Sequence, residues 1–201
     1  MDIRLRLVQA PMLPQVLFQG SNRPDFNEVS LINSGIQEDP MQRIAPCLWF
    51  DNQAEEAVNF YTSIFENSRI VKITRYGEEG AKVSGRPEGT VMTVMFLLDG
   101  QEFMALNGGP IFKFTEATSF VVNCESQGEV DYFWQKLSEG GEEGVCGWLK
   151  DKYGLSWQIV PTVLAGLLQD KNLEKTERVM GALLKMKKIN IEDLKKAYAQ
   201  S

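Results

Sequence analysis

The sequence predicts an α+β protein of two tandem βαβββ modules followed by C-terminal helices. Two observations predict this class. From Arg43 onward, short apolar runs of strand length alternate with amphipathic stripes of helical period. The same order of elements then recurs, and an offset of 73 residues places Glu56 on Glu129 and Phe60 on Phe133. The recurrence favours a duplicated unit over two unrelated helices that share apolar positions by chance.

The first module is assigned to residues 41–110 and begins with an apolar run at 43–50, which has the length of a strand. Asp51 and Asn52 follow this run, and both are residue types that cap helices. The helix after them carries apolar side chains on one face: Ala54, Ala57, Val58, Tyr61, Ile64 and Phe65. This spacing predicts one buried helix between the first two strands.

The rest of the first module reads as three strands and a loop. A strand is predicted at residues 68–76, and the stretch 77–89, rich in Gly, Pro and charge, is predicted to be a loop. Two further strands, 90–98 and 101–106, are joined by Asp99-Gly100, which is a strong hairpin signal.

The second module is assigned to residues 111–161. It begins with an apolar strand at 117–123, and Ser126 and Glu129 then have capping-box spacing. The helix that follows has an apolar stripe: Val130, Phe133, Trp134 and Leu137. Two more strands, 144–151 and 155–160, complete the pattern.

The two ends of the chain do not follow the pattern of the modules. Residues 1–40 hold four of the eight prolines, which predicts an N-terminal extension that is partly disordered or packed on the body. Residues 162–201 are predicted to form C-terminal helices. Their apolar stripes need a partner surface, either the body or another subunit.

Composition excludes several kinds of site. The chain has no histidine, so it cannot build a Ser-His-Asp triad, a Cys-His dyad or a His-ligated metal or haem centre. The net charge is -6 without a basic tract, which argues against nucleic acid and anionic membranes as partners. No apolar run is long enough to span a bilayer. Cys47, Cys124 and Cys146 lack C-x-x-C spacing and are expected to be reduced thiols of a cytoplasmic protein.

Four strings carry a closer resemblance: PCLWFDNQAEEAVNFYTSIF, FMALNGGP followed by IFKFTEA, CGWLKDKYGLSWQIVP, and RVMGALLKMKKI. They resemble the PhnB-like branch of the vicinal oxygen chelate superfamily, which includes glyoxalase I, extradiol dioxygenases and bleomycin and fosfomycin resistance proteins. That branch bears the label "3-demethylubiquinone-9 3-methyltransferase". The resemblance covers roughly residues 41–199. It implies that the modules form a cup-shaped mixed sheet holding the ligand or metal, and that the protein is a homodimer.

The resemblance also implies four ligand positions, one on the first and one on the last strand of each module. Counted onto this sequence, they are Pro46, Met104, Ser119 and Gln158. Gln158 ends a stretch, 151–158, that is similar to the superfamily's D-x-x-G-x-x-x-E pattern. A register error of one residue brings in Cys47 or Ala45, and Glu102 lies two positions from Met104.

These side chains do not suit a Lewis-acid centre. Proline has no donor, and thioether, hydroxyl and amide groups are weak ligands for a hard dication. We therefore expect no metal and no cofactor. No glycine-rich turn opens a helix after a strand, as a nucleotide-like cofactor would require.

The leading hypothesis is that the protein binds a small hydrophobic or amphipathic ligand in a metal-free cup. Its expected contacts are Pro46, Met104, Ser119, Trp148 and Gln158, and no catalytic residue is assigned. Trp157 is expected to point toward the helices and Cys146 to be a buried thiol. The alternatives are a methyltransferase acting on a demethylubiquinone-like quinone, a glyoxalase- or dioxygenase-type enzyme with a non-standard site, or an interaction module.

Overall fold

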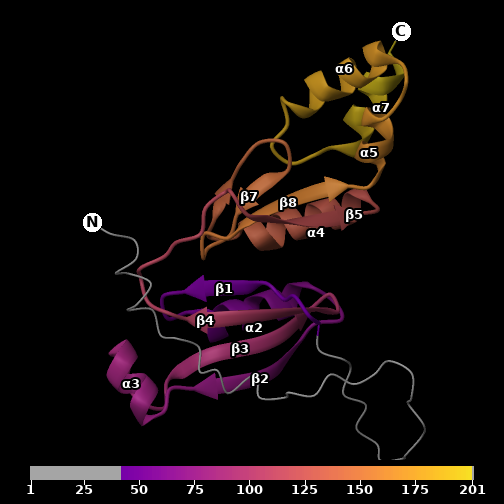
Figure 1. Ribbon diagram of the computed structural model, residues 1–201. Helices are drawn as coiled ribbons and strands as arrows, with labels where there is room; N and C mark the ends of the chain where they lie inside the picture. The colour runs from indigo at the N-terminus through magenta and orange to yellow at the C-terminus, as the bar shows by residue number, and fades with distance from the viewer. Residues whose placement is uncertain (1–41, 201) are drawn as a thin grey trace, which may run out of the picture. The chain divides into compact units, whose positions relative to one another are not determined.

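The computed structural model describes residues 42–200, in two compact units that divide between Phe112 and Lys113 (Figure 1). The predicted extension at residues 1–40 lies outside the described residues. Between residues 42 and 200, no helix is both long and apolar enough to cross a membrane.

The first unit holds one four-stranded sheet and two helices. Its elements are β1 (Cys47–Phe50), α2 (Ala54–Ile64), β2 (Arg69–Arg75), α3 (Glu78–Ser84), β3 (Val91–Leu98) and β4 (Gln101–Asn107). The strand order is β1-β4-β3-β2, with β1 parallel to β4 and the other neighbours antiparallel. The β3–β4 hairpin turns at Asp99 and Gly100, whose φ angles of 48° and 76° are the positive values that such a turn requires.

The second unit repeats this topology and adds helices. Its elements are β5 (Ser119–Cys124), α4 (Gln127–Ser138), β6 (Glu142–Glu143), β7 (Trp148–Lys150), β8 (Ser156–Pro161), α5 (Val163–Leu168), α6 (Leu173–Leu183) and α7 (Ile191–Ala199). The order β5-β8-β7-β6 matches the first sheet position by position. The predicted class, α+β with two duplicated modules of mixed sheet and C-terminal helices, is confirmed.

One predicted loop is wrong. Residues 77–89 contain the helix α3, which follows the edge strand β2 (Figure 1). The glycines misled the interpretation because Gly77 and Gly85 flank the helix as its N-cap and C-cap, and Gly85 has a φ of 70°. None of the α3 side chains is buried, so the helix has no apolar stripe by which the sequence would reveal it.

The two module helices begin differently. Ser126 accepts a hydrogen bond from the Glu129 backbone N–H at 3.2 Å, which confirms the predicted capping box of α4. At α2, neither Asp51 nor Asn52 is the cap. The Asn107 side-chain oxygen, from the end of β4, accepts from the Ala54 N–H at 2.9 Å. A cap supplied from 53 residues away is a tertiary contact, which local sequence does not reveal.

The C-terminal helices pack on the second module. A core cluster joins them: Leu164, Val179, Leu183, Ile189 and Leu194. Cys146 and Val160, from the module, pack against this cluster. The loop after α6 is also tied to the sheet, because the Cys146 and Gly147 N–H groups donate to the Met186 and Lys187 carbonyls at 2.8 Å each. The body therefore supplies a partner surface for these apolar stripes.

Candidate functional site: the open faces of the two sheets

Each sheet has one face covered by its module helix and one face turned away from it, which we call the open face. In the first sheet, Leu48, Phe50 and Ala105 are buried on the helix side. Strand alternation then places Cys47, Trp49 and Met104 on the open face.

The open face of the first sheet is rich in sulfur and apolar groups. Cross-strand pairing sets two rows of side chains across it: Cys47, Met104, Met95 and Lys72 in one, and Trp49, Leu106, Thr93 and Thr74 in the other. Met104 and Met95 are half-buried. Unbranched thioether side chains adapt to irregular apolar partners, so this face suits hydrocarbon contact.

The strand β1 pairs with β4 one residue away from the position that counting along the sequence predicted. Cys47, not Pro46, pairs with Met104, while the Pro46 carbonyl accepts a hydrogen bond from the Met104 N–H at 2.9 Å. The 73-residue offset holds for the helices but not for the first strands. Three residues separate β1 from α2 and two separate β5 from α4. The thiol of Cys47 thus stands in the row to which Pro46 was assigned.

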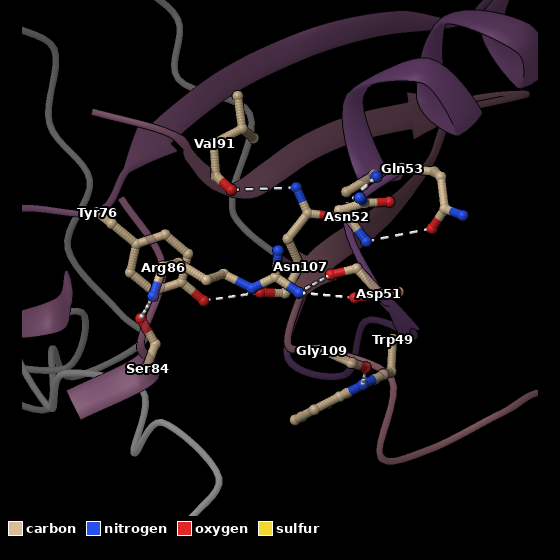
Figure 2. Close-up of polar contacts among 11 residues, drawn as sticks. Trp49, Asp51, Asn52, Gln53, Tyr76, Ser84, Arg86, Val91, Asn107 and Gly109 are labelled. Atoms are coloured by element: carbon tan, nitrogen blue, oxygen red, sulfur yellow. Dashed lines mark hydrogen bonds and ion pairs between the residues drawn. The ribbon is translucent and has the colours of Figure 1, made fainter. Parts of the chain in front are cut away.

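The Trp49 side chain on this face is fixed in place by its neighbours. Its indole N–H donates to the Gly109 carbonyl at 2.8 Å (Figure 2). Its ring also contacts Phe112 edge-on, with 5.0 Å between the ring centroids. A Cβ added at Gly108 would lie 2.2 Å from the indole, so only glycine fits beneath it. Gly108 therefore leaves room for the Trp49 ring, and Gly109 supplies the carbonyl that its N–H bonds.

A polar network lies beside Trp49. Arg86, just beyond α3, donates to the Asp51 carboxylate at 2.9 Å and to the Asp51 carbonyl, which ties the α3 segment to the end of β1 (Figure 2). Tyr76 donates through its hydroxyl to the Asn107 carbonyl at 2.7 Å, and Asn107 donates to the Val91 carbonyl at 3.0 Å. These groups satisfy one another, which is typical of a structural network rather than a ligand site.

The open face of the second sheet is polar. One row runs across all four strands, through Ser119, Ser156, Lys150 and Glu142. The next row runs through Val121, Gln158 and Trp148. Gln158 donates from its amide nitrogen to the Ser119 hydroxyl at 2.9 Å, so the two predicted polar contacts touch each other. Three of the five predicted ligand contacts thus share one face.

A hollow of about 160 Å³ lies at the β6 and β7 side of the second sheet. It is lined by Glu116, Glu142, Glu143, Gly144, Trp148, Leu149, Lys150 and Ser156. Among the predicted contacts only Trp148 lines it. Sequence reasoning missed Ser156, Lys150 and Glu142. Ser156 and Lys150 alternate with Gln158 and Trp148 along short strands, and Glu142, on the two-residue strand β6, had no such signal.

The hollow holds an ion pair. Lys150 and Glu116 approach to 2.5 Å, and this contact is the main cause that raises the pKa of Lys150 and lowers the pKa of Glu116. The Glu142 carboxylate raises the pKa of Lys150 further through its charge. The ammonium is thus paired with Glu116, and the Glu142 carboxylate acts on it through its charge alone.

The residues at the family's ligand positions do not fit a metal ion. With Cys47 in the place assigned to Pro46, thiol, thioether, hydroxyl and amide groups occupy them, and the amide of Gln158 is engaged with Ser119. Among residues 42–200, no group of three Cys, Asp or Glu side chains is arranged to hold a metal.

The remaining candidates from the sequence lie in the core, except Cys146, which was expected to be buried and is only partly buried. Trp157 is 2% exposed and donates to Asp151, so it faces the helix side as expected. Cys124 is fully buried, and desolvation, with a smaller contribution from the charge of Glu129, raises its pKa to about 11. Cys146 packs on the C-terminal helices. A thiol of raised pKa is a poor nucleophile at neutral pH.

Comparisons with known proteins agree with this architecture. The model of the family described as "3-demethylubiquinone-9 3-methyltransferase" matches residues 42–160. The matched range ends before α5 and is therefore shorter than the 41–199 that the resemblance suggested. No curated protein matches the chain.

Solved structures extend the comparison. The PhnB protein of Bacillus cereus, which bears the same methyltransferase description, is 42% identical over 60% of this chain and 100% of its own, with a TM-score of 0.54. A Pseudomonas aeruginosa protein is 19% identical over 60% and 98% of the two chains, with a TM-score of 0.49. The fosfomycin resistance protein FosX of Listeria monocytogenes is 15% identical over 63% and 96%, with a TM-score of 0.46. The first of these carries the family argument.

The family model spans more than half of the chain, and the two-module topology is the one that the family shares. The chain belongs to the PhnB-like family described as 3-demethylubiquinone-9 3-methyltransferases.

Proposed function

We propose that the protein binds a small amphipathic molecule on the open faces of its sheets, without a resident metal. The observation that carries this proposal is the chemistry of those faces. Thioethers and an indole dominate the first, and the second carries hydroxyl, amide and charged groups in ordered rows. Binding sites for small organic molecules combine apolar walls with a few placed polar groups.

The polar face supports recognition rather than metal chemistry. Ser119 and Gln158 are hydrogen-bonded to each other, which fixes the orientation of the amide at the family's ligand position. The remaining amide and hydroxyl capacity suits hydrogen bonds to an organic ligand.

Native mass spectrometry of the full-length protein, purified from cells without added ligand, tests this function. We expect a co-purified organic mass that denaturation releases. Met104→Glu should reduce its occupancy at least several-fold, because it places a charge on the thioether-rich face. Val83→Glu is the matched control, since Val83 is 69% exposed on α3 and belongs to none of the strands that form the open faces. Equal occupancy in the two variants, or a stoichiometric metal in place of an organic mass, contradicts the proposal.

The family description supports a second candidate, a methyltransferase acting on a demethylubiquinone-like quinone. Calorimetry with S-adenosylmethionine separates the two functions. Saturable heat at sub-millimolar cofactor supports the methyltransferase, and its absence at millimolar cofactor counts against it.

We further propose a homodimer in the cytoplasm, as the family resemblance and the three reduced cysteines suggest. Light scattering at micromolar concentration measures the oligomeric state directly. A mass equal to that of one chain contradicts the dimer.

A further inference from the structure

The hollow on the second sheet contains one polar atom that lacks a partner. Ser156 is 0% exposed, and its hydroxyl makes no hydrogen bond to any group in residues 42–200. It lines the hollow between Ser119 on one strand and Lys150 on the next. A buried hydroxyl without a partner has lost its bonds to water without a replacement, so such a group calls for an explanation. A ligand atom that enters the hollow would supply the missing bond.

The charged side chains that line the hollow are not all paired. Lys150 is neutralised by Glu116 at 2.5 Å. Glu143 accepts from the Trp134 indole at 3.1 Å and faces Lys187 at 3.8 Å. Glu142 is different: it is exposed, its charge acts on Lys150, and within the described part of the chain its carboxylate accepts no hydrogen bond. One carboxylate of the hollow is thus left without a directly bonded donor.

The indole of Trp148 adds a third feature that favours a cation. Trp148 is half-buried, lines the hollow, and lies on the β7 strand two positions from Lys150 on the same face. Tryptophan is the aromatic side chain that attracts cations best through its ring face. An unbonded carboxylate, an indole and an unpartnered hydroxyl therefore line one small hollow.

We propose that this hollow binds the protonated amine of a small ligand. The ammonium donates to the Ser156 hydroxyl oxygen and the Glu142 carboxylate, and it lies against the ring of Trp148. The inference rests on the proposed function, because the amine is the polar head of the amphipathic molecule proposed above. The volume of about 160 Å³ admits a head group and a few carbons, which is smaller than the 300–1,000 Å³ of sites that enclose whole drug-sized molecules.

An anionic head group fits the hollow less well. A carboxylate would have to displace Glu116 from Lys150 and would then face Glu142 and Glu143. An uncharged alcohol can bond Ser156 but gains nothing from the carboxylate.

Three isosteric probes test the head group on the full-length protein: n-butylamine, 1-butanol and butyrate, at pH 7 and low salt. The readout is the indole N–H signal of Trp148 in two-dimensional NMR, assigned by its loss in Trp148→Phe. We expect butylamine to saturate the shift at concentrations about tenfold below butanol, which corresponds to one charge-assisted hydrogen bond. Butyrate should leave the signal in place, and added salt should weaken the amine alone.

Two variants locate the contact. Ser156→Ala and Glu142→Gln should each weaken butylamine binding about five- to tenfold. Ser156→Ala should not lower the thermal midpoint of the free protein, because it removes an unsatisfied hydroxyl. Glu139→Gln is the charge-matched control, since Glu139 is exposed at the end of α4 and does not line the hollow.

The outcomes separate this inference from the proposed function. If butanol or butyrate binds as tightly as butylamine, or if Ser156→Ala leaves the amine affinity unchanged, the amine proposal is overturned and ligand binding stands. If none of the probes shifts Trp148, the amine proposal also falls. The co-purified mass then decides the proposed function independently.

Discussion

The carboxylate of Asp151 accepts a hydrogen bond from the Trp157 indole at 2.9 Å, and both side chains are 2% exposed. The other oxygen of Asp151 accepts from the backbone N–H groups of Tyr153 and Leu155 at 2.8 and 3.0 Å. One buried carboxylate thus holds the turn before β8 and anchors the first inward side chain of that strand. Because side chains alternate along β8, this anchor sets Ser156 and Gln158 on the open face.

Asp151→Ala should destabilise the protein by about 3 kcal/mol or more, because it leaves three buried donors without an acceptor. Urea denaturation followed by circular dichroism measures the loss. Glu88→Ala is the control, since Glu88 is exposed, and it should change the free energy of unfolding by less than about 0.5 kcal/mol. A loss below about 1 kcal/mol for Asp151→Ala would contradict the anchoring role.

Gly108→Ala should also destabilise, by about 2 kcal/mol or more. The added methyl would lie 2.2 Å from the Trp49 indole, and the ring must move away from its bond to Gly109. Gly181→Ala, inside α6 with no heavy atom within 4 Å of the new Cβ, should instead stabilise by up to about 1 kcal/mol. Thermal unfolding compares the two, and a shift of the same sign in both would refute the close-approach argument.

Cys124 should resist alkylation in the folded protein at pH 8. With its pKa raised to about 11, only about one thiol in a thousand is ionised there. Because the folded pKa lies above the unfolded value of 9.0, the contribution of this thiol to stability is complete below pH 9 and is lost as the pH rises to about 11.

Mass spectrometry after a timed iodoacetamide pulse checks the thiol. Cys124 should be labelled only when denaturant is present, while the exposed Cys47 should be labelled without it. Labelling of Cys124 in the native protein as fast as Cys47 would show that its site is open.

Arg86→Ala should loosen α3 without unfolding the module. The helix buries no side chain, and Arg86 ties its end to Asp51. Hydrogen exchange of the α3 amides should rise several-fold, whereas exchange in β3 should stay the same. Lys82→Ala is the matched control, because its partners Glu78 and Glu79 lie within α3 itself and this surface pair is worth little. If the α3 amides exchange equally fast in Arg86→Ala and Lys82→Ala, the contact of Arg86 with Asp51 does not hold the helix in place.

The elements that the sequence predicted well are those whose signals are local. Period-two and period-3.6 stripes identified the module helices and the strands other than β6, which is two residues long. Asp99-Gly100 identified the hairpin, and Ser126 with Glu129 identified the cap of α4. Each signal lies within a few residues of the structure that it forms. The sequence did not reveal the helix α3, because none of its side chains is buried and it therefore has no apolar stripe.

The candidate site was only partly accessible from the sequence. Counting from the helix indicated Ser119, and the D-x-x-G-x-x-x-E resemblance indicated Gln158; the structure joins the two by a hydrogen bond. The same count placed Pro46 where Cys47 stands, because a one-residue difference in loop length shifts a strand by a full side-chain face.

The sequence by itself determined the duplicated architecture and the kinds of chemistry that a chain without histidine cannot support. The tertiary structure decided the rest: which residue caps α2, where the C-terminal helices pack, and which side chains form a row across β5, β8, β7 and β6. The physical reason is that strand pairing brings together groups far apart in the chain. Ser156 acquires its neighbours Ser119 and Lys150 only through register, and its unpartnered hydroxyl exists only in the packed sheet.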